Sequence, residues 1–237
     1  MLEYLIETDK QLLCSLNSWG TPEADSLWLV ITNELSSIPL YAFLLYLCFK
    51  YFHWKRVLLI LVFIALLITT TDQLANVFKY GFQRLRPCHD ESLIGQMRMV
   101  ICGGKYGFFS AHAANTMAIA VFFSYLLRKN ARYIVTLLLC WSIIVSYSRI
   151  YLGVHFPGDV LVGWIFGTLL ATLYYFLFLF FLHFLSIVHH VLHSSCCCLP
   201  SCLLSYDHLH LTSSFLPIYF FPFGLDYYSD TMCFRFE

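Results

Sequence analysis

The chain has 237 residues, of which 59% are hydrophobic and only 12% are charged, and its formal net charge at pH 7 is zero. A soluble domain of this length is closer to half apolar and a quarter charged, so the composition excludes an ordinary soluble protein. The apolar residues are gathered in long blocks, which indicates an integral membrane protein, and no nucleic-acid partner is expected.

Residues 1–22 are expected to form a helix that lies at the membrane interface. Their sequence, MLEYLIETDKQLLCSLNSWGTP, is acidic near its start and lacks a long apolar stretch, so it does not have the pattern of a signal peptide. Its apolar residues follow an approximate helical stripe, which is typical of an interfacial helix. The residues of this stripe are Leu2, Leu5, Ile6, Leu12, Leu13 and Leu16.

Residues 23–185 are expected to form a bundle of about five transmembrane helices, so the predicted fold class is an all-α polytopic membrane bundle. Crossing a hydrocarbon core of about 30 Å takes about 20 helical residues. The segment that begins SAHAAN is the least hydrophobic of the five, and a strict hydropathy window would miss it. The candidate spans are residues 26–49, 57–79, 110–127, 133–151 and 158–184.

Two short connections between the spans are rich in basic residues. The sequence KYFHWKR at 50–56 joins the first two spans, and RKNAR at 128–132 joins the third and fourth. By the positive-inside rule both lie in the cytoplasm, which places the loops 80–109 and 152–157 on the opposite face. The expected location is therefore a bacterial inner membrane, with these two loops facing the periplasm. The basic residues of loop 80–109 argue against this placement unless they have another task.

The exit of the second span carries a first group of basic residues, in the sequence KYGFQRLRP. Lys79 and Arg86 are seven positions apart, so they would share a helix face if the helix continued that far. Pro87, however, discourages helix at Arg86 and favours an end to the helix. Taken alone, these residues, with Arg84 among them, are expected only to snorkel toward the lipid headgroups.

The start of the third span carries a second group, in the sequence GFFSAHAAN. Ser110 suits a helix N-cap, which places His112 in the first helical turn. Unpaired backbone N–H groups and the helix dipole favour an anion at such a position. A lone histidine there would more often be an interfacial side chain than a catalyst.

The connection between the last two spans carries a third group, in SRIYLGVHFPGD at 148–159. Arg149 ends the fourth span, and Pro157 suits the first residue of the fifth helix. Asp159 then falls in the first turn of that helix, where the dipole favours an ionised carboxylate. It could accept a ring N–H of His155 and leave the other nitrogen free as a base or nucleophile. The alternative is an ion pair between Arg149 and Asp159 that only joins two helices.

Together, the three groups indicate a phosphate site, because the topology inferred from other residues places them at the same end of the bundle. Guanidinium groups and helix N-termini both suit phosphoryl oxygens. A phosphate site also explains the basic residues of the outer loop, which would bind an anion rather than set the topology.

The spacing within these groups resembles that of the type 2 phosphatidic acid phosphatase superfamily, whose signatures are K-x6-RP, PSGH and SR-x5-H-x3-D. Residues 79–87 (KYGFQRLRP) and 148–159 (SRIYLGVHFPGD) match the first and third signatures in every specified residue. Residues 109–112 (FSAH) depart from the second, because Phe109 replaces proline and Ala111 replaces glycine. The chain is most similar in plan to the short bacterial members that act on undecaprenyl pyrophosphate and lipid A.

This resemblance implies a role for each matching residue. His155 would attack phosphorus to form a phosphohistidine, and Asp159 would orient it. His112 would protonate the leaving oxygen and then activate water. No metal ion or other cofactor is expected. The phosphoryl oxygens would be bound by Lys79, Arg86, Ser110 and Arg149.

The implied activity is hydrolysis of a phosphomonoester or pyrophosphate of a membrane lipid, of the undecaprenyl pyrophosphate or lipid A type. Phosphatidate and phosphatidylglycerophosphate remain alternatives, because apolar lipid-facing residues do not distinguish these substrates. Vanadate haloperoxidases carry the same signatures, but they are soluble. A non-catalytic membrane protein that binds lipid phosphate is a further alternative, although it would need neither the histidines nor the aspartate. The oligomeric state stays open.

Other polar residues and the cysteines leave further hypotheses open. Asp72 and Glu34 are costly within a membrane, but hydrogen bonds between helices are a sufficient explanation for them. Cys88 and Cys102 flank part of the outer loop and would form a disulfide in an oxidising compartment if they lie close enough. Residues 186–237 are expected to form an irregular, poorly ordered tail whose cysteines and histidines fit no standard zinc spacing.

Overall fold

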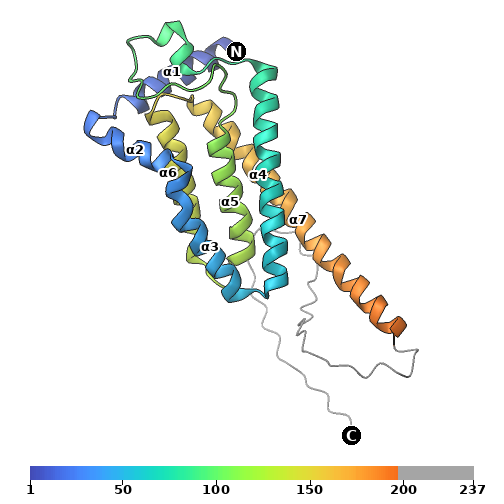
Figure 1. The fold of residues 1–237 in the computed structure, drawn as a ribbon. Helices are drawn as coiled ribbons and strands as arrows, with labels where there is room; N and C mark the ends of the chain where they lie inside the picture. Colours follow the sequence, from blue (N-terminus) through green and yellow to red (C-terminus); the bar gives the residue numbers. More distant parts are fainter. Residues whose placement is uncertain (197–237) are drawn as a thin grey trace. The chain divides into compact units, whose positions relative to one another are not determined.

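A computed structural model describes residues 1–196 of the chain, and this part consists of helices joined by loops (Figure 1). Residues 197–237, which hold most of the expected irregular tail, lie outside the described residues. The helices are α1 (Leu2–Asn17), α2 (Asp25–Thr32), α3 (Ile38–Tyr51), α4 (Trp54–Phe82), α5 (Ala111–Leu127), α6 (Tyr133–Tyr151) and α7 (Pro157–Cys196). Short 3-10 turns occur at Pro22–Ala24, Glu34–Ser37, Pro87–His89 and Glu91–Leu93.

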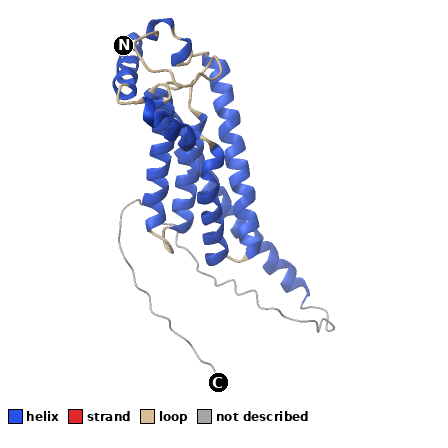
Figure 2. Cartoon of the chain, turned by 60° about the vertical axis from the view of Figure 1, so that its left-hand side comes forward, coloured by secondary structure: helices blue, strands red, loops and turns tan. Residues whose placement is uncertain are grey.

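Helices α3 to α7 pack as a bundle in the compact unit formed by residues 1–191 (Figure 2). Helix α5 packs against α4 and α6, while α1 and α2 lie against α6. The largest cluster of buried apolar side chains draws on all five bundle helices. No strand occurs among residues 1–196, so the predicted all-α membrane bundle is confirmed.

Among residues 1–196, three helices are long and apolar enough to cross a membrane, namely α4, α6 and the part of α7 up to Val188. Helices α2 and α3 together would make a fourth span, but they meet at 67°. The break lies at Asn33, whose side chain accepts a hydrogen bond from the backbone of Leu35 and so starts a new turn. Helix α5 has only 17 residues. The prediction of an integral membrane protein is confirmed, whereas the count of five spans is not, and the first expected span is bent.

Two glycines on one face of α7 bring this helix close to α5. A Cβ atom at Gly163 would lie 2.8 Å from the carbonyl oxygen of Ser110, and one at Gly167 would overlap the carbonyl of Ala114. Small residues four positions apart allow this kind of close helix contact within membranes. The start of α5 is therefore held beside the start of α7, where Asp159 lies.

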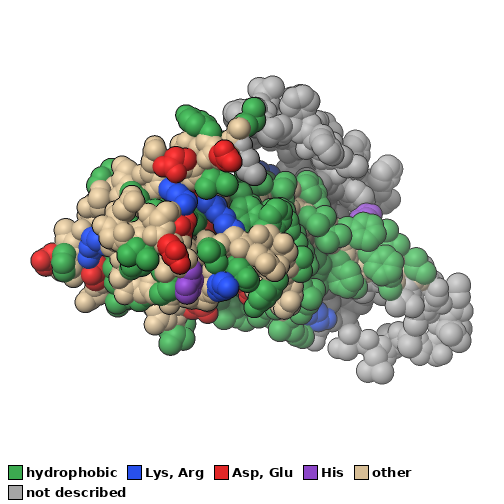
Figure 3. Space-filling view, turned by 90° about the horizontal axis from the view of Figure 1, so that it is seen from above, with side chains coloured by type: hydrophobic (Ala, Val, Ile, Leu, Met, Phe, Trp, Pro, Cys, Tyr) green, Lys and Arg blue, Asp and Glu red, His purple; other side chains and the backbone are tan. Residues whose placement is uncertain are grey.

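Charged side chains gather at the end of the unit formed by α1 and the loop between α4 and α5 (Figure 3). Two ion pairs tie this loop to the N-terminal helices, with 2.7 Å between Lys10 and Asp90 and 2.9 Å between Arg98 and Asp25. A disulfide joins Cys88 and Cys102 and closes part of this loop on itself. The sequence had left this disulfide as one of two possibilities.

Helix α4 ends before it reaches the second arginine of the KYGFQRLRP segment. Its last residue is Phe82, and Gln83 follows in the left-handed conformation with φ of 51°. Arg86 is extended, with ψ of 157°, as a residue before proline prefers. Lys79 and Arg86 therefore do not share a helix face, because the effect of Pro87 on its neighbour prevails.

Candidate active site

A cavity of about 500 Å³ lies between α3, α4, α5 and the end of α6. Charged and imidazole side chains line one part of it, and the rest is largely apolar. The cations and imidazoles are Lys79, Arg86, His112, Arg149 and His155, and the carboxylates are Asp72 and Glu34. The apolar lining includes Leu44, Leu45, Ile60, Ile64, Ile68 and Phe123. Such a cavity suits an amphiphile with an anionic head.

Five different segments deliver the polar lining. Lys79 comes from the last turn of α4, and Arg86 from the loop that follows it. His112 lies in the first turn of α5, and Arg149 in the last turn of α6. His155 comes from the loop before α7. The sequence-based prediction placed these residues at one end of the bundle, and the structure brings them to one cavity.

His155 and Asp159 form a buried pair at the start of α7. Nδ1 of His155 lies 3.4 Å from Oδ2 of Asp159, and the same oxygen accepts the backbone N–H of Phe156 at 3.1 Å. The two side chains are 2% and 0% exposed. An ionised Asp159 therefore favours the tautomer with the proton on Nδ1, which leaves Nε2 with a free lone pair.

Three cations face the cavity, and no carboxylate of the described residues lies at hydrogen-bond distance from them. Arg149 donates through Nη1 to Thr32, while its buried Nε has no hydrogen-bond partner in the described part of the chain. Within residues 1–196, the side chain of Arg86 donates only to the backbone carbonyl of Tyr106, at 3.2 Å. For Lys79, no hydrogen bond or ion pair joins it to any described residue. The arrangement is therefore suited to an anion supplied from outside.

The predicted alternative, in which Arg149 pairs with Asp159, is not found among the described residues. Asp159 instead pairs with Arg84, with 2.8 Å between Nη1 and Oδ1. The role of Arg149 is therefore not to join two helices through that carboxylate, and its guanidinium stays directed at the cavity.

The segment FSAH places its two polar residues differently. His112 lines the cavity, and its Nε2 lies 3.8 Å from Oε1 of Glu34. Ser110 is fully buried and is the N-cap of α5, where its hydroxyl accepts the backbone N–H of Ala113 at 3.4 Å. Ser110 is not part of the cavity lining, so the predicted contact between its hydroxyl and phosphate stays a prediction.

The two departures from the PSGH signature are accommodated by packing. Phe109 is fully buried and stacks on Phe166 of α7, with 5.0 Å between ring centroids and 15° between ring planes. Ala111 is the first residue of α5, and it has no positive φ that would favour glycine. The helix start that presents His112 is thus formed without the proline and the glycine.

Burial and nearby cations lower the pKa of His155 well below its usual value. Removal from water is the main cause, and the positive charges of Arg86, Arg149 and Lys79 add to it. The imidazole is therefore neutral at pH 7. A neutral ring with Nδ1 held by Asp159 is the form that a nucleophile or base requires.

Four polar residues near the cavity were not assigned to the active site from the sequence. Asp72 lines the cavity and accepts a hydrogen bond from Asn115 at 2.8 Å, which fits the inter-helix bond expected for it. Glu34 also lines the cavity, at the break between α2 and α3. Arg84 and Asp9 lie outside the cavity lining. Arg84 donates to Asp159 of the buried His155–Asp159 dyad, and it also donates to Asp9. No sequence motif indicates these contacts, because they join segments that are distant in sequence.

The chain matches the PAP2 superfamily over residues 56–183. It is 39% identical over 181 residues to the lipid A 4'-phosphatase of Bacteroides thetaiotaomicron, covering 75% of this chain and 80% of that protein. It is 34% identical over 185 residues to the lipid A 4'-phosphatase of Porphyromonas gingivalis, covering 76% of each chain. The solved PAP2-type phosphatidylglycerolphosphate phosphatase of Bacillus subtilis has a similar fold, with a TM-score of 0.57 and 24% identity, over 75% of this chain and 86% of that one.

Proposed function

Since this chain belongs to the PAP2 superfamily and brings two histidines and three cations to one amphipathic cavity, we propose that it hydrolyses a phosphate ester of a membrane lipid through a phosphohistidine. The observation that carries the proposal is the set of unpaired cations around a neutral, buried histidine. A phosphoryl group would supply the missing anion. The chain is a lipid phosphatase of the PAP2 type, and the residue roles below are part of the proposal.

The first chemical step is attack by Nε2 of His155 on phosphorus. The N–P bond forms as the bond to the leaving oxygen breaks, and His112 gives its proton to that oxygen. Asp159 stabilises the positive charge that develops on the ring through its contact with Nδ1. In the second step water attacks phosphorus, His112 takes up the proton of that water, and the N–P bond breaks to release phosphate.

The cations supply most of the stabilisation in this scheme. Phosphoryl transfer spreads negative charge over three equatorial oxygens, and donors already in place stabilise it without rearranging. Arg149 and Arg86 can each present a fork of N–H groups, and Lys79 a point charge. Protein cations thus occupy the place that metal ions have in many phosphatases, and we expect activity to persist in EDTA.

A lipid A-type glycolipid phosphate is the proposed substrate, on the non-cytoplasmic face of the membrane. Two relatives that cover three quarters of this chain carry the name lipid A 4'-phosphatase. The placement of the face rests on the basic connections 50–56 and 128–132, which lie at the other end of the helices from the cavity's cations.

A polyprenyl diphosphate is the second candidate, because the apolar part of the cavity is deep. Ile60 and Lys79 both line it and are 19 positions apart on α4, which corresponds to about 28 Å along a helix. That depth exceeds one leaflet of a hydrocarbon core about 30 Å thick. A relative of lower coverage, from Sulfolobus acidocaldarius, is named undecaprenyl-diphosphatase, with 31% identity over 42% of this chain.

The test is phosphate release by detergent-purified protein in EDTA. The panel holds lipid A, undecaprenyl diphosphate, phosphatidate and phosphatidylglycerophosphate, and His155→Ala is the inactive control. Fastest release from lipid A, lost in the control, supports the proposal. Release from none of these lipids, by protein that still binds orthovanadate, would contradict it and favour a non-catalytic phosphate-binding protein.

A further inference from the structure

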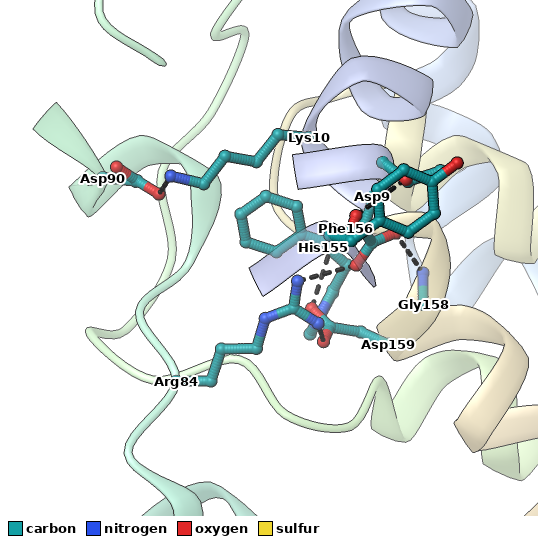
Figure 4. Close-up of polar contacts among 10 residues, drawn as sticks. Asp9, Lys10, Arg84, Asp90, His155, Phe156, Gly158 and Asp159 are labelled. Atoms are coloured by element: carbon teal, nitrogen blue, oxygen red, sulfur yellow. Dashed lines mark hydrogen bonds and ion pairs between the residues drawn. The ribbon is translucent and has the colours of Figure 1, made fainter. Parts of the chain in front are cut away.

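Arg84 joins two carboxylates that come from opposite parts of the chain (Figure 4). Its Nη1 donates to Oδ1 of Asp159 at 2.8 Å, and its Nη2 donates to Oδ2 of Asp9 at 2.6 Å. Asp159 belongs to the buried dyad on α7, whereas Asp9 lies on the N-terminal helix α1. One guanidinium therefore connects α1 to the carboxylate that contacts His155.

Asp9 makes a second contact, with the first turn of α7. Its Oδ1 accepts the backbone N–H of Gly158 at 2.8 Å. A Cβ atom at position 158 would lie 2.7 Å from the other oxygen of Asp9, so glycine leaves room for this close approach. A carboxylate at this place satisfies an unpaired helix N–H and interacts favourably with the helix dipole.

Arg84 is also held from a second side. The centre of its guanidinium lies 4.1 Å from the centroid of the Phe156 ring, within the range of a cation–π contact. Phe156 directly follows His155 and is 2% exposed. The guanidinium is thus fixed by one ring and two carboxylates, although its side chain is 25% exposed.

These contacts divide the two oxygens of Asp159 between different partners. Oδ1 is used by Arg84, and Oδ2 by Nδ1 of His155 and the backbone N–H of Phe156. Without Arg84, Oδ1 would be a buried charged oxygen with no partner, which is costly. The carboxylate would then turn toward water or another donor, and the contact with His155 would weaken.

We infer that Arg84 and Asp9 are positioning residues, which act through Asp159 to hold the ring of His155 in its reactive tautomer and orientation. The inference rests on the proposed role of His155 as nucleophile. Arg84 is not part of the cavity lining, so it acts on the rate of the chemical step rather than on phosphate binding. Helix α1 is accordingly a component of the active site and not only an interfacial anchor.

The kinetic test compares Arg84→Gln, Asp9→Asn and the double variant with Lys10→Gln. Lys10 is the matched control, since it also joins α1 to the outer loop, through Asp90 and Ser92 at 2.7 Å each, but it does not touch the dyad. We expect Arg84→Gln to lower kcat by about 10- to 100-fold with KM changed by less than about twofold. Asp9→Asn should have a smaller effect, and the double variant should match Arg84→Gln alone, because both act along one chain of contacts.

An equal loss of kcat in Lys10→Gln would show that only the docking of α1 matters, and it would overturn the inference. A kcat of Arg84→Gln near that of the unmodified protein would also overturn it. A second measurement does not depend on turnover. ¹⁵N spectra of histidine-labelled protein, assigned with His155→Ala, should show Nδ1-protonated His155, and mixed tautomers in Arg84→Gln. An unchanged His155 spectrum in Arg84→Gln would overturn the inference even if the protein hydrolysed no lipid, whereas absent hydrolysis alone would count against the proposed function.

Discussion

The two walls of the cavity differ in how tightly they are held. The wall from α5, α6 and the start of α7 carries Arg149, His155 and Asp159, which are 8%, 2% and 0% exposed. The facing wall, from α2 and α3, carries Glu34, whose side chain is 84% exposed, and α2 has no buried residue. The side chains of the first wall are thus fixed by buried contacts. In the facing wall, α3 buries Leu44 and Cys48, whereas α2 and Glu34 are more exposed. Under the proposed function, the first wall would perform the chemistry and the second would contact the body of the lipid.

The largest effect is expected at the tightly held wall, from His112→Ala. Loss of a general acid and base should lower kcat by about 10²- to 10⁴-fold. The loss should be smaller for a substrate with a good leaving group, which needs no proton. The matched control is His183→Ala, since His183 lies exposed on α7 outside the cavity. Equal activity in His112→Ala and the control would remove His112 from the mechanism.

Arg149→Lys tests whether this wall binds phosphate by a fork of donors. Lysine keeps the charge but loses the planar pair of N–H groups, so kcat/KM should fall by about 10²-fold. Arg132→Lys, in the connection at the other end of α6, should leave kcat/KM unchanged. A fall of less than about twofold in Arg149→Lys would show that only the charge is needed.

Ile64→Trp places a large side chain in the apolar part of the cavity. We expect kcat/KM to fall by about tenfold for a long-chain lipid phosphate and to change little for a short-chain one. Val62→Trp is the control, because Val62 lies on the same helix, is 53% exposed and does not line the cavity. Equal losses for both substrates would mean that the cavity does not hold the lipid chain.

A smaller effect on activity is expected in the loop between α4 and α5. Replacing both Cys88 and Cys102 with serine removes the cross-link that closes the loop carrying Arg86. Without the cross-link the unfolded chain gains conformational entropy, which lowers the free energy of unfolding by about 3 kcal/mol for a loop of this length. Tm should therefore fall, and kcat/KM should decrease by a few-fold. Cys140→Ser, at an unpaired cysteine on α6, should change neither quantity.

The smallest effect concerns how the free energy of unfolding depends on pH. The pKa of His155 is lowered in the folded state, whereas the unfolded chain takes up this proton near pH 6.5. The contribution of this pKa difference to the free energy of unfolding is fully present above pH 6.5. It decreases by about 1 kcal/mol per pH unit as the pH falls below about 6.5. Tm should therefore fall less steeply between pH 7 and pH 5.5 in His155→Gln. Equal slopes would contradict a lowered pKa.

Much of the structure at the end of the bundle that holds the cavity's cations could be predicted from local sequence rules. Ser110 caps α5, Pro157 begins α7, and Asp159 lies in the first turn within reach of His155. Each of these features depends on residues only a few positions apart, so backbone geometry alone determines it. The break at Asn33 was not predicted, because apolar composition does not distinguish a straight helix from a bent pair.

The sequence by itself determined the class of fold, the candidate histidines, aspartate and cations of the site, and the end of the bundle at which they meet. Helix periodicity, prolines, caps and basic connections act locally, and they need no knowledge of the partner helices. Only the tertiary structure decided that Asp159 pairs with Arg84 rather than Arg149, and that Asp9 of α1 completes this contact. Those choices depend on which side chains converge after packing, and packing joins residues some 75 and 150 positions apart.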